Sequence, residues 1–151
     1  MRTDNMIFRL NSTQIIPFWD AIKYACVRAD SVPKSEMQSY FNNLLHDLLS
    51  DKAQCFVVLT PGRILNSVVI TRVTADKFLT VKELHIQCLY SMATLSNEDL
   101  IDHFSFIGDF AKSQGCKLIT YHSSNPRIWE IAEVLGCEEQ FRSFSLDLGG
   151  E

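Results

Sequence analysis

The chain has 151 residues, of which 46% are hydrophobic and 21% are charged, and its formal net charge is −4. This size and composition exclude a disordered or fibrous protein and predict one globular domain over residues 1–151. Lysines and arginines are scattered along the chain. Because phosphate backbones are bound by clustered cations, we expect no nucleic-acid-binding surface.

The sequence carries no pattern for export or for membrane insertion. Residues 1–12 have neither a long apolar run nor a small-residue cleavage site, so we expect no secretory signal peptide. The longest apolar runs span about five residues, whereas a membrane helix needs about 20, so we also expect no membrane segment.

The five cysteines are spread singly along the chain and form no C-x-x-C motif. They are Cys26, Cys55, Cys88, Cys116 and Cys137. An odd number of isolated cysteines argues against a disulfide framework and against a zinc site. Most have apolar neighbours, so we interpret them as small buried hydrophobic residues of a protein in a reducing intracellular compartment.

The first third of the chain predicts a strand followed by two helices. A short apolar run at Met6–Leu10 can form the strand. Apolar residues then recur at steps of three and four, first between Ile15 and Ala29 and again between Met37 and Leu49. This spacing is typical of helices that bury one stripe in a core.

Three strands are predicted next. Cys55–Thr60 and Ile64–Val73 flank the turn Pro61-Gly62-Arg63 and should form an antiparallel hairpin. The third strand runs from about Leu79 to Tyr90. Alternation predicts that four of its apolar residues share one face: Leu84, Ile86, Cys88 and Tyr90. A one-residue bulge near Lys82 would bring the residues before it into phase.

The remaining elements alternate between helix and strand. They are a helix between Ser96 and Gly115, a buried strand at Leu118–His122, a helix from Ser124 or Asn125 to Gly136, and a half-buried strand at Phe141–Leu148. The resulting order is β-α-α-β-β-β-α-β-α-β. The residues alone therefore predict a mixed α/β or α+β domain around one central sheet.

Residues 116–148, CKLITYHSSNPRIWEIAEVLGCEEQFRSFSLDL, resemble the C-terminal half of the GNAT acyltransferase superfamily. That family usually has N-x-x-A-x-x-x-Y-x-x-x-G-F between two strands, and Asn125 and Gly136 match the pattern. The resemblance implies an α/β GNAT-like fold, with a mostly antiparallel sheet of about six to seven strands and about four helices.

The same resemblance points to a missing cofactor site. The family binds the pyrophosphate of acetyl-CoA on a glycine-rich loop, Q/R-x-x-G-x-G/A, before its third helix. Here the corresponding stretch, Tyr90–Asp99, has no glycine and no basic residue, and Glu98 and Asp99 fall in the first turn of the helix. The tyrosine that serves the family as general acid is replaced by Ala132. We therefore expect no cofactor to be bound in the usual way.

Three residues are candidates for catalysis if the chain is nevertheless active. The resemblance implies a general base on the fourth strand, where Glu83 and His85 are available and would share one face if no bulge separates them. Tyr121 could replace the missing acid. The alternative interpretation is a solvent-facing side of the sheet for Glu83 and His85 and a packed aromatic residue for Tyr121.

The other histidines give weaker signals. His122 precedes Ser123 and Ser124, but the chain has no G-x-S-x-G motif and serines before Asn-Pro are ordinary helix caps. His46 and His103 stand beside aspartates in helical segments. Since no H-x-x-x-H or H-E-x-x-H motif occurs, we expect no metal site.

Two main functions remain open, and a third is less favoured. The first is a non-catalytic GNAT-like structural or docking protein that binds other protein chains and no cofactor. A looser resemblance, to small GNAT-like internal virion proteins of short-tailed bacteriophages, implies phage structural proteins as partners and a location in the virion or the host cytoplasm. The second is a divergent acetyl-CoA-dependent N-acyltransferase with Glu83 or His85 as base. The third is an acidic protein that masks a basic partner, for which a charge of −4 is mild.

Overall fold

The computed structural model describes residues 5–29, 32–75, 81–122, 126–139 and 144–149. Within them lie five strands and four α-helices, with a single 3₁₀ turn, Lys34–Glu36, before α2. The elements are β1 (Met6–Arg9), α1 (Ser12–Ala29), α2 (Met37–Leu49), β2 (Gln54–Leu59), β3 (Leu65–Ala75), β4 (Lys82–Ser91), α3 (Asn97–Ser113), β5 (Leu118–Tyr121) and α4 (Pro126–Leu135). Up to α4 this is the predicted order.

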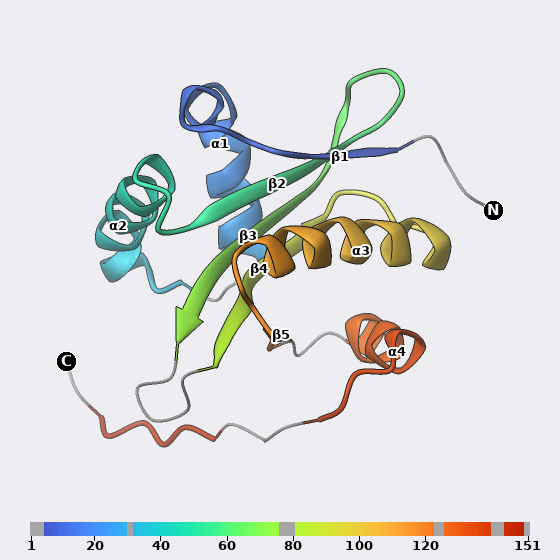
Figure 1. Cartoon of the computed structure of the whole chain (residues 1–151). Helices are drawn as coiled ribbons and strands as arrows, with labels where there is room; N and C mark the ends of the chain where they lie inside the picture. The colour runs from blue at the N-terminus through green and yellow to red at the C-terminus, as the bar shows by residue number, and fades with distance from the viewer. Residues whose placement is uncertain (1–4, 30–31, 76–80, 123–125, 140–143, 150–151) are drawn as a thin grey trace.

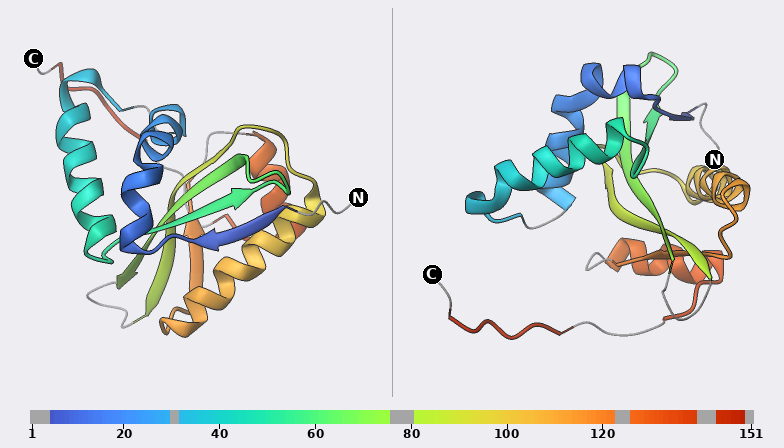
Figure 2. Two further views of the ribbon diagram at one scale, coloured as in Figure 1. Left: turned by 90° about the horizontal axis from the view of Figure 1, so that it is seen from above. Right: turned by 60° about the vertical axis from the view of Figure 1, so that its left-hand side comes forward.

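The five strands form one sheet in the order β1-β2-β3-β4-β5 (Figure 1). The first three pairings are antiparallel and the fourth, between β4 and β5, is parallel. A parallel pairing needs a crossover connection, and α3 supplies it. Helices α1 and α2 cover one face of the sheet, and α3 and α4 lie on the other (Figure 2). The mixed α/β, mostly antiparallel arrangement confirms the predicted fold class, with fewer strands than expected.

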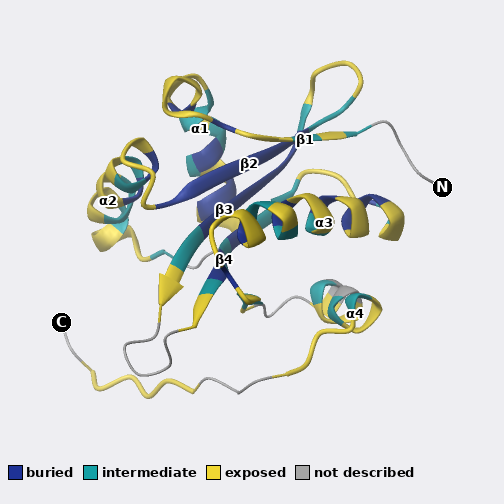
Figure 3. Ribbon diagram, viewed as in Figure 1, coloured by how far each residue is buried: buried dark blue, intermediate teal, exposed yellow. Residues whose placement is uncertain are grey.

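Each face of the sheet has its own apolar cluster. On the α1 and α2 side, Ile15, Ile22, Leu44 and Leu48 contact the sheet, and on the other side Ile107 and Ala111 of α3 do so. Both faces of the central strands are therefore covered, and residues 54–58 of β2 are all buried (Figure 3). Burial on both faces explains why this strand is a continuous apolar run instead of an alternating one. Four of the cysteines are also buried, as predicted; the exception is Cys137.

A bulge interrupts the pairing of β3 with β4. The register passes from Ile70 opposite Cys88 to Thr71 opposite Ile86, which leaves Gln87 unpaired. One extra residue reverses the alternation of side chains beyond it. Ile86 therefore packs with the α3 cluster, as Leu84 does, whereas Cys88 packs with α1 and α2, as Tyr90 does. The prediction that these four share one face was wrong. Lys82 itself pairs regularly with Ala75, and residues 76–80, which the bulge near Lys82 was predicted to bring into phase, lie outside the described part of the chain.

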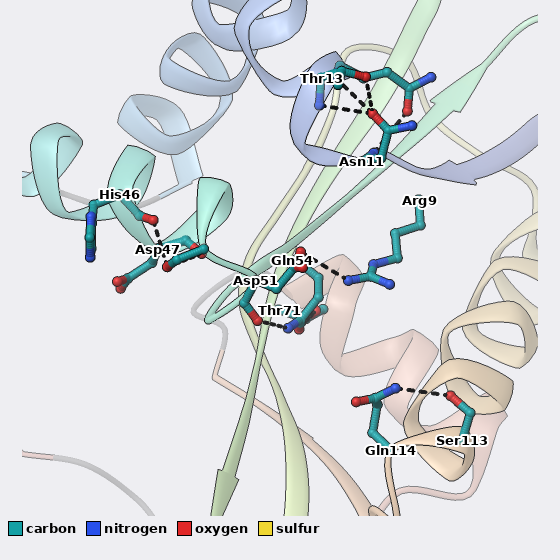
Figure 4. Close-up of polar contacts among 12 residues, drawn as sticks. Arg9, Asn11, Thr13, His46, Asp47, Asp51, Gln54, Thr71, Ser113 and Gln114 are labelled. Atoms are coloured by element: carbon teal, nitrogen blue, oxygen red, sulfur yellow. Dashed lines mark hydrogen bonds and ion pairs between the residues drawn. The ribbon is translucent and has the colours of Figure 1, made fainter.

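Polar side chains define the ends of the helices. The Asn11 side-chain oxygen accepts hydrogen bonds from the backbone N–H groups of Thr13 and Gln14, at 3.0 and 3.1 Å, and the Gln14 side chain accepts one from the Asn11 N–H at 2.9 Å (Figure 4). This reciprocal pair is a capping box at the start of α1. Gly115 and Gly136, with φ of 79° and 75°, follow α3 and α4 and end them as predicted.

The predicted final strand is not formed by the residues described. Residues 141–143 and the expected cap of α4 at Ser124 or Asn125 lie outside the described part of the chain. Residues 144–148 do not form a strand, and Phe144, Leu146 and Leu148 are 89%, 84% and 89% exposed. The prediction of a half-buried strand was wrong here because alternation shows what a strand would bury, but not whether a sheet edge lies beside it.

Candidate functional site

The parallel junction of β4 and β5 brings the polar candidates together. The β4 partners of β5 are Glu83–Ile86, so β4 runs on past the end of β5 as far as Ser91. The register places Thr120 beside His85 and Leu118 beside Glu83. Since no bulge separates Glu83 from His85, the two side chains share the face of the sheet that carries α1 and α2, as the sequence predicted.

His85 contacts two residues of or next to β5, Thr120 and His122. Its Nδ1 is 3.0 Å from the Thr120 hydroxyl oxygen, and its ring centroid is 5.0 Å from that of His122. Burial lowers the pKa of His85 below its usual value, the His122 ring lowers it further, and Glu83 opposes the shift. The imidazole is therefore neutral near pH 7, which is the form that can accept a proton.

Glu83 is held by β3 and not by His85. The Thr74 hydroxyl donates a hydrogen bond to its Oε1 at 3.2 Å. Within this site Glu83 therefore acts on His85 as a nearby negative charge. Of the two predicted bases, His85 is therefore the better candidate, because it lies beside the Thr120 hydroxyl and the His122 ring, whereas Glu83 contacts Thr74.

A polar network continues from this face to α2. The Arg72 guanidinium, opposite His85 in the β3–β4 register, donates to the Gln87 side-chain oxygen at 2.6 Å and forms an ion pair with Asp47 at 2.6 Å. The Gln87 side-chain nitrogen donates to the Tyr40 hydroxyl at 3.3 Å. Sequence reasoning missed this network. Its only local signal was Arg72, the one charged residue of strand β3.

Tyr121 does not join the other candidates. It neighbours Ile86 in the parallel register, and its side chain lies on the opposite face, where its ring is 6.0 Å from that of Phe104. Its hydroxyl donates to the Cys137 Sγ at 3.7 Å. Burial, followed by this contact, raises the pKa of Tyr121. A phenol held on the other side of the sheet from His85 is poorly placed to act with it as an acid–base pair.

Near the start of α3, where the acetyl-CoA pyrophosphate loop would lie, three backbone N–H groups already have acceptors within the protein. The Met92 and Ala93 N–H groups donate to the backbone and side-chain oxygens of Asn66, at 2.7 and 3.1 Å. The Asp99 N–H donates to the Ser96 hydroxyl oxygen at 3.1 Å, and this cap was predicted. Buried Leu95 packs in this loop against Leu100 of the helix.

Charge at the same place disfavours an anion. Exposed Glu98 and buried Asp99 occupy the first turn of α3 and already complement the positive end of its dipole. Two like unit charges about 5 Å apart repel by about 1 kcal/mol in water and about 3 kcal/mol at an effective dielectric constant near 20. The residues at this helix start therefore do not fit the pyrophosphate of acetyl-CoA.

Neither a metal centre nor a membrane-spanning helix is found among the residues described. No three His, Cys, Asp or Glu side chains there are arranged to hold a metal ion. Of the helices described, none is both long enough and apolar enough to cross a bilayer.

Solved acetyltransferases resemble the chain over nearly its whole length. An aminoglycoside acetyltransferase from an uncultured soil metagenomic sample has a TM-score of 0.73 at 12% identity and covers 97% of this chain and 100% of its own. A ribosomal-protein-alanine N-acetyltransferase from Brucella melitensis has a TM-score of 0.67 at 13% identity and covers 95% and 99%.

A third structure was solved with the cofactor. It is described as a predicted acetyltransferase with acetyl-CoA, from Clostridium acetobutylicum, and has a TM-score of 0.72 at 10% identity over 95% of this chain and 96% of its own. No protein-family model and no curated protein sequence matches the chain. At these identities the likeness concerns the fold, and the chain has the fold of the GNAT acetyltransferases.

Proposed function

We propose that this chain is a GNAT-fold protein that docks other protein chains and does not transfer acyl groups from acetyl-CoA. The observation that carries the proposal is the closed, acidic start of α3. Three backbone N–H groups of this stretch donate to Asn66 and Ser96 and are not free for a phosphate. Glu98 and Asp99 add negative charge. Ala132, which stands where the family usually has its acid tyrosine, also argues against acyl transfer.

Exposed apolar side chains support the docking part of the proposal. Those with more than half of their surface in solvent include Met6, Ile16, Ile64, Leu118, Trp129, Val134, Phe144, Leu146 and Leu148. Three of them, Phe144, Leu146 and Leu148, lie together in the last described segment, where a partner chain could cover them. Placement in a bacteriophage virion, with phage structural proteins as partners, stays a prediction from the sequence.

Thermal unfolding with and without acetyl-CoA or CoA tests the proposal. A ligand at 100 times its dissociation constant would add about 2.7 kcal/mol to the free energy of unfolding and raise the melting temperature by about 5–10 °C. We expect no shift with either compound at millimolar concentration. A clear rise would contradict the proposal, and loss of that rise on strengthening the negative charge, in Asn97→Asp, would place the cofactor at the start of α3.

The second candidate function is acyl transfer to an amine, and the surroundings of His85 favour it. A neutral imidazole beside Thr120 and His122 could take a proton from a substrate amine. If so, His85→Gln should lower the rate of amine-dependent thiol release by about 10²–10⁴-fold, whereas the exposed His46→Gln should leave it unchanged. Absence of thiol release with a panel of amines would exclude this function for those substrates.

A further inference from the structure

Two histidine rings lie side by side at the parallel junction of β4 and β5. The ring centres of His85 and His122 are 5.0 Å apart, and the rings are tilted by 58° to each other. His85 belongs to β4 and His122 directly follows β5, so the strand register brings them together. Two imidazoles that bind one tetrahedral Zn²⁺ at about 2.0 Å have ring centres about 5 Å apart. The pair therefore has the spacing of two ligands of one metal ion.

A hydrogen bond orients the His85 ring for such a role. Its Nδ1 is 3.0 Å from the hydroxyl oxygen of Thr120 on the neighbouring strand. In the tautomer whose Nδ1–H donates to this oxygen, the ring's lone pair is on Nε2. Histidines that bind metals almost always have a partner of this kind on the second ring nitrogen, which fixes the tautomer and the ring orientation. Thr120 thus supplies the outer contact that a metal-binding His85 needs.

The charges around the pair suit a cation. Glu83 stands two residues before His85 on the same face of the sheet and adds negative charge beside it. Arg72 faces His85 from β3, but its positive charge is balanced by an ion pair with Asp47 at 2.6 Å. His122 is exposed and His85 is half-buried, so an ion can reach the two rings from solvent.

The chemistry of two imidazoles selects the class of ion. Imidazole suits Zn²⁺, Cu²⁺ and Ni²⁺, whereas Mg²⁺ and Ca²⁺ take oxygen ligands. In the part of the chain that the structure describes, no third His, Cys, Asp or Glu side chain is arranged to complete a set of three ligands. Water, or a side chain of another molecule, would therefore fill the remaining positions of a tetrahedral ion.

We propose that His85 and His122 form an open two-histidine site for a divalent transition-metal ion such as Zn²⁺. The ion would join the end of β5 to β4. This site goes beyond the proposed docking function and does not depend on it, because metal binding is measured without CoA and without a partner chain.

Calorimetric titration of the reduced full chain with Zn²⁺, up to about 1 mM, tests the site. We expect one Zn²⁺ per chain and no binding of Mg²⁺ over the same range. His85→Gln and His122→Gln should each raise the dissociation constant for Zn²⁺ at least tenfold. Thr120→Val removes the outer contact and should raise it by about 10–100-fold. The matched control His46→Gln, at an exposed position on α2, should bind Zn²⁺ like the parent.

NMR of the histidine ring protons locates the ion without any substitution. The chain has four histidines. One equivalent of Zn²⁺ should shift the assigned signals of His85 and His122 and leave those of His46 and His103 in place. Because His122 is exposed, His122→Gln should also keep the parent's melting temperature in the absence of metal, so that its loss of binding is not a loss of fold.

Three results would overturn the proposal. The first is a parent chain that binds no Zn²⁺ up to about 1 mM. The second is an unchanged affinity in both His85→Gln and His122→Gln. The third is loss of binding in Cys137→Ser, since this exposed cysteine would then hold the ion in place of the histidine pair.

Discussion

The backbone N–H of Asp99 donates a hydrogen bond to the Ser96 hydroxyl oxygen at 3.1 Å, and this bond closes the start of α3. In the GNAT fold this helix start is where the family's cofactor loop lies. Here the Ser96 hydroxyl oxygen accepts a hydrogen bond from a backbone N–H of the first turn. The buried Asp99 carboxylate adds negative charge to the same turn. The first turn of α3 therefore does not fit the pyrophosphate that the family binds at this place.

Ser96→Ala should destabilise the protein because it removes the cap. Loss of an N-cap hydroxyl costs about 1 kcal/mol, so the free energy of unfolding in urea should fall by about that amount. Ser105→Ala, at an exposed position in the interior of the same helix, should change it by less than about 0.5 kcal/mol. Equal effects of the two substitutions would mean that the Ser96 hydroxyl does not stabilise α3.

Arg72→Met should destabilise the protein through the network between the sheet and α2. The side chains of Arg72 and Asp47 are 28% and 21% exposed and lie 2.6 Å apart, so removal of the guanidinium leaves a half-buried carboxylate without its cation. We expect the free energy of unfolding to fall by about 1–2 kcal/mol.

A double-mutant cycle with Asp47→Asn measures the coupling of this pair. The exposed pair Lys23–Asp20, at 3.4 Å, is the matched control, and Asp20→Asn should cost less than about 0.5 kcal/mol. Strictly additive effects of Arg72→Met and Asp47→Asn would show that the pair contributes no interaction energy.

Local sequence patterns correctly predicted the helix ends, because each end depends on residues close by in the chain. Ser96, Gly115 and Gly136 stand at helix ends because a cap or a left-handed residue is a local requirement. The bulge at Gln87 could not be placed in this way, because it depends on the register between two strands. The proximity of His122 to His85 depends on the parallel register of β4 with β5, which follows a crossover through α3. The prediction of a strand at the C-terminal end was wrong for the same reason, because a strand needs a neighbouring strand that local alternation does not reveal.

Gly136→Ala should destabilise the end of α4 through its backbone angle alone. A Cβ added at Gly136 meets no atom within 4 Å, but its φ of 75° is unfavourable for a residue with a side chain, at a cost of about 1 kcal/mol. Gly62 also has open space and lacks a positive φ, so Gly62→Ala should change the free energy of unfolding by less than about 0.5 kcal/mol. A Gly136→Ala variant as stable as the parent would show that α4 does not end in this conformation.

His103 makes the stability of the fold depend on pH. It is 6% exposed, it lines an apolar cavity of about 20 Å³ between α3 and the sheet, and its Nδ1 has no hydrogen-bond partner among the described residues. Burial lowers the pKa of His103 below its usual value of 6.5, against opposing contributions from Asp99, the Asn5 backbone and Asp102. The unfolded chain therefore binds a proton more readily than the folded protein below about pH 6.5.

Stability should be complete above about pH 6.5 and should fall as the pH drops from there toward the lowered pKa of folded His103. His103→Asn removes this titration, so the difference in free energy of unfolding between about pH 7.5 and 5.5 should shrink. Part of the difference should remain, because burial also lowers the pKa of His85. His46→Asn, at an exposed position, should keep the parent's pH dependence. Urea unfolding at the two pH values measures all three proteins, and an unchanged difference in His103→Asn would show that this histidine is not the titrating group.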